Sequence, residues 1–272
     1  NSRLLSTYLQ ALLSYPDAAT FRPERIPDPA DASIIIAKAD CVPGPLPKET
    51  ARIDLVTQAK ARGRRDLVYC THTGVRDLTA HLKSLLEAAG LRVGILSVHT
   101  TTAERREAWV TERVAADGLD VLITNPELVK TGLDLWDFPE IAFYETGYNI
   151  FTLRQAARRS WRIGQREPVT VTYFLYQRTM QEQAMRLIAS KLESSLAIEG
   201  ELTDHGLAAL SDSGDTMSVA LARTLVDKLT RSESAEVCWA RLRAKELSQA
   251  LGVTGVAPVV LSPPTPPAPH AP

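Results

Sequence analysis

The sequence predicts an α/β fold in which a parallel sheet lies between two layers of helices. Five short apolar runs lie between residues 66 and 176, and helical periods separate them. The runs do not alternate apolar and polar residues, which is typical of strands buried on both faces. The predicted strands are 66–70, 92–98, 120–124, 140–145 and 169–176, and the predicted helices are 75–89, 102–116, 152–162 and 180–195.

Three of these helices carry a start signal, a Thr followed three residues later by Glu or Gln. In such a capping box each side chain satisfies a backbone N–H group of the first turn. The three pairs are Thr101 with Glu104, Thr152 with Gln155, and Thr179 with Glu182.

The chain divides by composition into four segments. Residues 1–47 predict a helix followed by an irregular proline-rich arm, because closely spaced prolines exclude regular structure. The α/β pattern occupies 48–199, and 200–255 predicts a small helical appendage. Residues 256–272 form a proline-rich tail that cannot supply a packed core, so we expect it to be disordered.

The composition excludes several classes of protein. The 272 residues carry a net charge of −1, so any nucleic-acid surface must be local. Three scattered cysteines and five histidines without ligand spacing predict neither a disulfide framework nor a zinc site. No apolar run has membrane-spanning length and no signal peptide is apparent, so we expect a cytoplasmic protein, nucleoid-associated if bacterial, that does not bind membranes.

One short stretch, QAARRSWRIGQ at 155–165, concentrates positive charge. Arginines stand at positions 154, 158, 159, 162 and 166, and no acid appears before Glu167. On a helix, residues three and four apart are neighbours, and no interleaved acid would offset their repulsion. The planar guanidinium group suits phosphate oxygens. The stretch is therefore either a solvated helix face or a surface that binds an anion.

Polar residues follow the predicted strands at their carboxyl ends, where open parallel sheets bind ligands. Hydroxyl groups there can donate to phosphates, although such residues also occur in ordinary loops. The candidates are Thr71, His72 and Thr73 after the first strand, His99 after the second, Thr124 and Asn125 after the third, and residues 145–149 after the fourth.

The arginine stretch resembles the sixth conserved motif of the Swi/Snf-type translocases of helicase superfamily two. LVYCTHTG resembles the fourth motif, VLITNPELVKTGLDL the fifth, and VTVTYFLYQRTMQEQAM the strand and helix after the sixth. The resemblance covers about residues 48–195. Its seven matching positions in the sixth motif are Gln155, Ala156, Arg159, Arg162, Ile163, Gly164 and Gln165.

The sequence departs from the family pattern at three places. More residues separate Thr124 from Gly132 than the fifth motif usually encloses. Asp134 replaces the Asn that is common in remodelling enzymes, and Trp161 stands where His is frequent.

The resemblance implies a RecA-like three-layer lobe of a motor that holds ATP and Mg²⁺ between two lobes. The first lobe of such motors carries a phosphate-binding loop and an acidic box. This sequence contains no Gly-Lys pair and no Asp-Glu dipeptide, so it resembles the second lobe alone. The expected partners are an N-terminal RecA-like lobe of the same protein, which would hold most of the ATP and Mg²⁺, and double-stranded DNA.

The resemblance implies a role for each matching residue, and it implies no metal ligand in this chain. Gln155 also suits a helix cap, Gly132 a turn, and Asp134 a cap. The implied catalytic residues are the arginine fingers Arg159 and Arg162, the ATP-binding residues Gly132, Asp134 and Gln155, and the nucleic-acid-binding residues Thr71, His72, Thr73, Thr124 and Asn125.

The expected function is that of a second motor lobe, inactive as an ATPase alone. The alternative is a non-catalytic nucleic-acid-binding module with a degenerate helicase lobe. A Rossmann-type dinucleotide enzyme is disfavoured because no Gly-x-Gly-x-x-Gly motif follows a strand.

Overall fold

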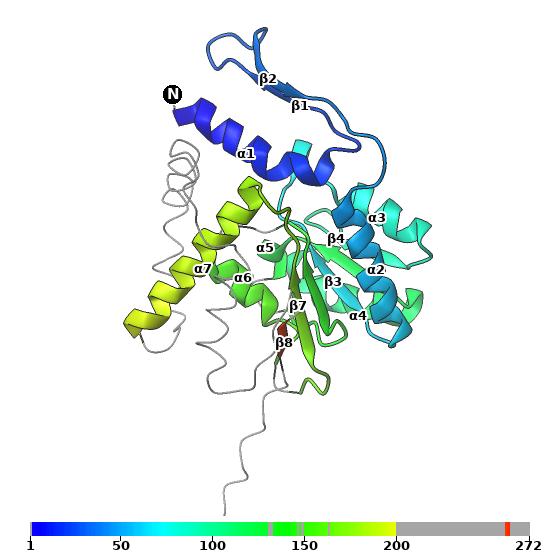
Figure 1. Ribbon diagram of the computed structural model, residues 1–272. Coiled ribbons are helices and arrows are strands. Elements are labelled where there is room, and N and C mark those ends of the chain that lie inside the picture. Colours follow the sequence, from blue (N-terminus) through cyan, green and yellow to red (C-terminus); the bar gives the residue numbers. More distant parts are fainter. Residues whose placement is uncertain are drawn as a thin grey trace, which may run out of the picture. The chain divides into compact units, whose positions relative to one another are not determined.

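The computed structural model describes residues 2–129, 133–145, 147, 150–162, 164–199 and 259–261 (Figure 1). The chain forms two compact units, of which the second contains the predicted sheet. The first unit comprises Asn1–Lys48, Gly147–Phe151 and Leu175–Ala257, and the second comprises Glu49–Thr146, Thr152–Phe174 and Pro258–Pro272. The predicted helical appendage at 200–255 lies outside the described residues.

The second unit is built on a six-stranded sheet with the order β4-β5-β3-β6-β7-β8. The first five of these strands in sequence run parallel, which confirms the predicted parallel sheet. They are shorter than predicted by one to three residues. Their bounds are β3 Asp66–Tyr69, β4 Val93–Leu96, β5 Val121–Thr124, β6 Glu140–Phe143 and β7 Val169–Tyr173.

The sixth strand, β8 (Val259–Leu261), lies within the tail that the sequence predicted to be disordered. It pairs antiparallel with β7, with Val259 opposite Val171. Three consecutive apolar residues, Val259, Val260 and Leu261, supply this strand, and the prolines around them had hidden it in the sequence.

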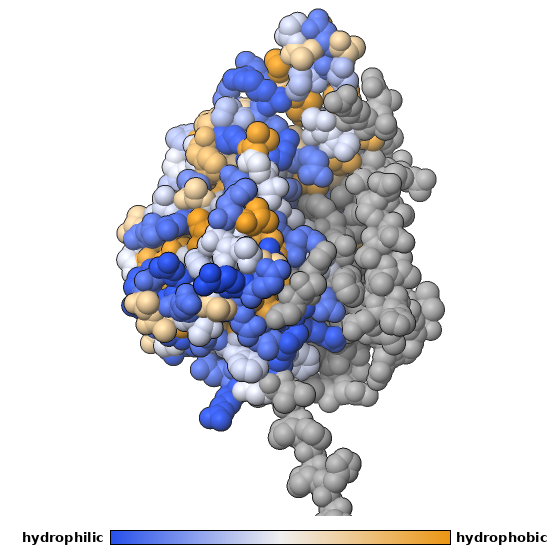
Figure 2. Space-filling model, turned by 180° about the vertical axis from the view of Figure 1, so that it is seen from behind, coloured by the Kyte–Doolittle hydropathy of each residue, from blue (hydrophilic) through white to orange (hydrophobic). Residues whose placement is uncertain are grey.

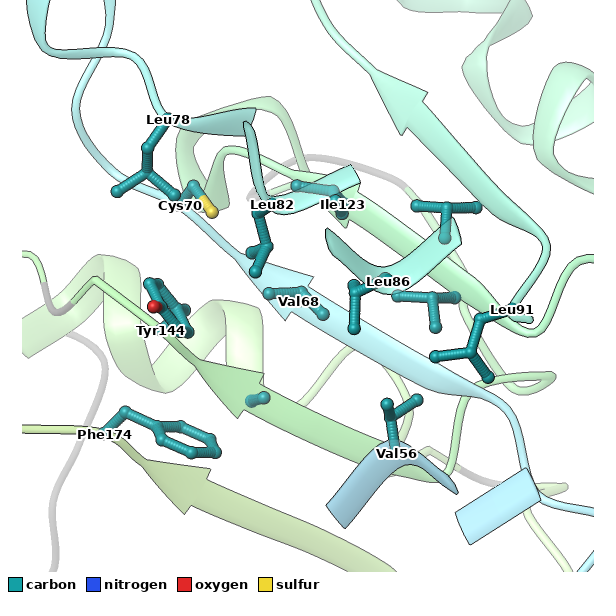
Figure 3. Packing of buried hydrophobic residues seen from close by; sticks show 13 residues of the cluster. Val56, Val68, Cys70, Leu78, Leu82, Leu86, Leu91, Ile123, Tyr144 and Phe174 are labelled. Atoms are coloured by element: carbon teal, nitrogen blue, oxygen red, sulfur yellow. The ribbon is translucent and has the colours of Figure 1, made fainter. Parts of the chain in front are cut away.

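Helices cover both faces of the sheet, as Figure 1 shows. On one face lie α2 (Pro47–Ala61), which the sequence did not predict, and α3 (Thr79–Ala88). Their apolar side chains meet the buried face of the strands in one core cluster (Figure 3). Its labelled members include Val56 from α2, Leu82 and Leu86 from α3, and Val68 and Ile123 from the sheet.

The opposite face of the sheet is aromatic where α6 (Ile150–Ala157) covers it. The rings of Tyr69 and Phe143 lie 4.9 Å apart between centroids, and those of Phe143 and Tyr173 lie 4.8 Å apart. The hydroxyl group of Tyr69 donates to the carbonyl of Ala156 on α6 at 3.0 Å. This bond ties α6 to the central strand. The remaining helices of the unit are η1 Gly74–Arg76, η2 Ala103–Arg105, α4 Arg106–Asp117 and α5 Pro126–Val129.

The first unit contains α1 (Ser2–Ala18), a two-stranded antiparallel sheet and α7 (Met180–Glu199). The strands are β1 (Glu24–Pro27) and β2 (Ile35–Ala39), so the prediction of an irregular arm is wrong for these residues. Pro47 does not exclude regular structure either, because it opens α2, where a missing N–H group costs nothing.

A buried ion pair stabilises the first unit. The ammonium group of Lys48 lies 2.7 Å from the carboxylate of Asp17, and both side chains are almost fully buried. The amide of Gln181 on α7 donates to the same carboxylate at 2.8 Å. Burial raises the pKa of Asp17, although Lys48 opposes that rise.

Of the three predicted capping boxes, one has both of its side chains bonded to backbone N–H groups at the start of the helix. Thr179 accepts from the N–H group of Gln181 at 3.2 Å, and Glu182 accepts from the N–H group of Arg178 at 2.6 Å. The box predicted at Thr101 is wrong, because η2 begins at Ala103 and α4 only at Arg106. The box at Thr152 is wrong too, because Thr152 lies inside α6 and donates to Glu127 at 2.8 Å.

Candidate functional site

The arginine segment does not form one helical surface. The helix α6 ends at Ala157, and residues 158–162 continue as turns and bends. The N–H group of Arg159 bonds the carbonyl of Ala156 at 3.2 Å, which closes the last turn. The predicted helical spacing of Arg158, Arg159 and Arg162 is therefore wrong, and their positions depend on the loop that contacts them.

An acidic partner for the segment comes from another part of the chain. The guanidinium group of Arg162 forms an ion pair with the carboxylate of Asp134, which lies in the loop before β6. The side chain of Arg162 is 42% exposed and that of Asp134 is 28% exposed. The structure thus brings together two residues that the resemblance assigned to nucleotide binding. Asp134 also supplies the negative charge that the arginine stretch itself lacks.

Gln165 fastens the arginine segment to the loop that carries Asp134. Its amide nitrogen donates to the carbonyls of Trp136 at 3.1 Å and Ser160 at 3.0 Å. Its amide oxygen accepts from the N–H groups of Arg166 at 2.9 Å and Glu167 at 3.0 Å. A buried amide with all four bonds made is a rigid support. We call the residues 133–136, 158–162 and 164–167, which this amide joins, the arginine cluster.

Arg159 occupies a different environment from Arg162 within the arginine cluster. It is 4% exposed, and its carbonyl accepts from the N–H group of Leu135 at 3.1 Å. Burial lowers the pKa of Arg159, and the charge of Arg162 adds to that effect. Arginine stays protonated despite such a shift. Arg162 is consequently the residue of the two whose charged group reaches the surface.

The carboxyl edge of the sheet holds a second group of predicted residues around Glu145. The N–H groups of Thr71 and His72 both donate to one carboxylate oxygen of Glu145, each at 2.9 Å. The hydroxyl group of Thr71 donates to the carbonyl of Glu145 at 3.0 Å. Glu145 is 2% exposed. Thr71 and His72, which the resemblance assigned to nucleic acid, thus direct these donors to Glu145.

Glu145 also lies where the topology of the sheet favours a ligand. It follows β6, which is the neighbour of β3, and the chain leaves these two strands toward opposite edges of the sheet. Ligands of open α/β sheets bind at such switch points. In this protein the carboxylate of Glu145 accepts the hydrogen bonds of the backbone N–H groups of Thr71 and His72 at this switch point.

Thr124 and Asn125 at the end of β5 also bond within the protein. Thr124 is 1% exposed, and its hydroxyl group donates to the carbonyl of Leu96 at 2.9 Å. The amide nitrogen of Asn125 donates to the carbonyl of Thr71 at 3.0 Å, and its oxygen accepts from the N–H group of Glu127 at 2.9 Å. Asn125 therefore caps α5 and braces the neighbouring loop.

The remaining predicted residues are separated. Thr73 is exposed and precedes η1. Gln155 is half-buried on α6 and does not begin that helix, so its predicted capping role is wrong. Gly132 lies outside the described residues. Sequence reasoning missed the supporting roles of Gln165 and Glu145. The only signal for Gln165 was its match to the sixth motif, and the only signal for Glu145 was its position after a predicted strand.

One face of the molecule is mostly polar. On the face shown in Figure 2, hydrophilic side chains predominate over the described residues and hydrophobic ones form small groups. Within the described ranges, no set of three or more His, Cys, Asp or Glu side chains is placed to hold a metal ion. A search of the same residues finds no helix that is both long and apolar enough to span a membrane.

Comparisons with known proteins agree with this architecture. No protein-family model matches the chain. The ATP-dependent helicase fft3 of Schizosaccharomyces pombe is 25% identical over 146 residues, which are 54% of this chain and 15% of fft3. The DNA excision repair protein CSB of Oryza sativa subsp. japonica is 26% identical over 141 residues, 50% of this chain and 12% of that protein. The chain thus spans a small fraction of these relatives.

A solved structure shows a similar fold. The crystal structure of the C-terminal part of the Fun30 ATPase domain has a TM-score of 0.50 and 15% identity, and the match covers 68% of this chain and 57% of that one. This likeness shows a similar fold, and the sequence similarities show that the chain resembles part of fft3 and of CSB. The predicted family resemblance and the RecA-like α/β fold are confirmed.

Proposed function

We propose that this chain is the second motor lobe of an ATP-dependent DNA translocase or helicase. In this role Arg162, with Arg159 behind it, acts as an arginine finger on ATP that is bound mainly by a separate first lobe. That lobe, part of the same protein, would also hold the Mg²⁺. The two sequence relatives named above are an ATP-dependent helicase and a DNA excision repair protein, which supports a helicase-family lobe.

The observation that carries this proposal is the half-exposed guanidinium group of Arg162. It is held at the surface by the arginine cluster, and its partner in the structure is a carboxylate, an anion that a phosphate group can replace. Because Asp134 is also partly exposed, this exchange needs no unpacking of the core. The donor set therefore fits a nucleotide phosphate.

Asp134 supplies a second contact in this proposal. Once Arg162 has turned to the phosphate, the carboxylate of Asp134 is left to accept hydrogen bonds from the ribose hydroxyl groups. Gly132 and Gln155 stay in the proposal as ATP-binding residues on the motif match alone.

The proposed nucleic-acid contact is at the carboxyl edge of the sheet. Thr73 has an exposed side chain there and remains a proposed phosphate contact, as does the half-buried His72. The hydroxyl groups of Thr71 and Thr124 donate within the protein. In this proposal the two residues therefore support the loops and do not contact nucleic acid. Asn125 acts through its bond to Thr71.

A non-catalytic nucleic-acid-binding module is the second candidate. The ion pair of Arg162 with Asp134 and the burial of Arg159 favour it, because a degenerate lobe would keep both arginines for internal contacts. The two candidates differ in whether ATP hydrolysis depends on Arg162.

The deciding experiment measures nucleic-acid-stimulated ATP hydrolysis by the protein that contains both lobes. Arg162→Ala should lower turnover by about 10³- to 10⁵-fold if the residue is a finger. The control is Arg113→Ala on α4, whose exposed pair with Asp117 makes it a surface arginine of similar exposure. Equal turnover in both variants would reject the motor in favour of the module. Turnover by this chain alone that Arg162→Ala abolishes would instead contradict the expectation that the lobe is inactive without the first lobe.

A further inference from the structure

The arginine cluster presents an aromatic ring beside its charged pair. Trp136 is 49% exposed, although burying a large apolar side chain stabilises a fold by about 1.5–3 kcal/mol. It stands two residues after Asp134, in the same loop. None of the roles assigned above uses this ring.

The backbone at Trp136 is held in place by hydrogen bonds. Its carbonyl accepts from the buried amide of Gln165, and the preceding N–H group, that of Leu135, bonds the carbonyl of Arg159. Gly164 has a positive φ of 104°, and a Cβ atom built there would lie 3.9 Å from the six-membered ring of the indole. The indole thus lies beside a residue without a side chain, and its exposed part is turned to solvent.

Three neighbouring groups then match the three parts of a nucleotide. Arg162 offers a guanidinium group for phosphate, Asp134 a carboxylate for ribose hydroxyl groups, and Trp136 an aromatic surface for a base. Stacking of a base on an aromatic side chain requires only an accessible ring of this kind.

We propose that Trp136 stacks on the base of the nucleotide that this lobe shares with the first lobe, and that it favours purines over pyrimidines. This inference rests on the proposed function. The preference follows from the larger stacking surface of a purine. A base of single-stranded nucleic acid offers the same chemistry, but the proximity of Asp134 and Arg162 favours the mononucleotide.

The test measures equilibrium binding to the two-lobe protein and compares wild type, Trp136→Phe and Trp136→Ala. The probes are ATP, CTP, inorganic tripolyphosphate and a single-stranded oligonucleotide. Trp136→Ala should weaken ATP binding by about 5- to 150-fold, the effect of losing one base stack. It should weaken CTP less and leave tripolyphosphate unchanged, and Trp136→Phe should retain most of the ATP affinity.

Each other outcome contradicts the inference. Unchanged ATP affinity in Trp136→Ala, or equal losses for ATP and tripolyphosphate, would show that the ring does not contact the base. A loss confined to the oligonucleotide would assign the ring to nucleic acid instead. Failure of the proposed function has a different signature: wild type would not bind ATP, or Arg162→Ala would hydrolyse it normally whatever residue stands at 136.

Discussion

The guanidinium group of Arg162 is ion-paired with the carboxylate of Asp134, 28 residues away in sequence. Both residues belong to motifs that the sequence assigned to ATP, and the structure joins them directly. The pair sets the resting position of the proposed finger, which must leave Asp134 to reach a phosphate. The partial exposure of the ion pair determines how much free energy is needed to break it.

We expect the pair to contribute little to stability. Exposed ion pairs typically contribute about 1 kcal/mol or less, and both of these side chains contact solvent. Asp134→Ala and Arg162→Ala should each lower the free energy of unfolding by about 1 kcal/mol or less, and their coupling in a double-mutant cycle should be as small. Urea denaturation measures both. A coupling of several kcal/mol would mean that Arg162 is a structural residue.

Glu145 should contribute far more to local order than the ion pair of Arg162 with Asp134. Glu145→Ala leaves two backbone N–H groups, those of Thr71 and His72, without their acceptor, a change that costs about 1–3 kcal/mol. Glu145→Gln keeps an oxygen for both donors and should cost less. Hydrogen exchange at the two amides should accelerate in the alanine variant. Exchange as slow as in wild type would show that the carboxylate does not hold this loop.

Two threonines at the same edge of the sheet should separate folding from binding. Thr124→Val removes the donor to the carbonyl of Leu96 and should destabilise the protein by about 1 kcal/mol, without changing nucleic-acid affinity in folded protein. Thr73→Ala should weaken nucleic-acid binding without destabilising the protein, because Thr73 is exposed. Denaturation curves and binding titrations at several salt concentrations measure the two effects. Weaker binding by folded Thr124→Val would restore that residue to the contact surface.

Two aspartates at the amino edge of the sheet should give opposite pH dependences. Burial raises the pKa of Asp66 from its ordinary 3.8 to about 6, although Arg52 at 2.5 Å opposes the rise. The folded state therefore binds the proton more tightly than the unfolded state. The contribution of Asp66 to stability is complete below its unfolded pKa and is lost as the pH rises through about 6.

Asp120 behaves in the reverse way. Burial would raise its pKa, but hydrogen bonds from Arg92 and Lys60 lower the pKa from 3.8 to about 2. Its contribution is present above 3.8 and is lost as the pH falls through about 2. Unfolding free energies of wild type, Asp66→Asn and Asp120→Asn across pH 2–7 test both signs. Identical slopes in wild type and Asp66→Asn between pH 4 and 6 would contradict the assignment for Asp66.

The five parallel strands could be predicted because their apolar runs record burial on both faces of a sheet. The helix α2 was missed because its buried face is not purely apolar. Arg52 is 1% exposed on that helix, where it pairs with Asp66 on β3. A pattern search counts an arginine as solvated, so a helix that buries one through a distant acid escapes it.

The site shows the same limit. The motif match selected Arg162 and Asp134 separately, but spacing rules consider only pairs within one helix. The contact depends on the loop before β6 and on the amide of Gln165, which a one-dimensional pattern does not relate. The hydroxyl groups of Thr71 and Thr124 were predicted to face a ligand because they follow strands. Thr71 bonds Glu145, which follows β6, the neighbour of β3. Thr124 bonds Leu96 on β4, the neighbour of β5.

The most direct test of the central claim compares nucleotide states in the two-lobe protein. A finger contacts charge that develops on the transferring phosphoryl group, so Arg162 should contribute to binding of Mg-ADP with a metal-fluoride transition-state analogue far more than to binding of ADP alone. We predict that Arg162→Ala weakens the analogue complex by at least about 100-fold and leaves ADP affinity within a few-fold of wild type. Equal affinities of wild type and Arg162→Ala for the analogue would contradict the account.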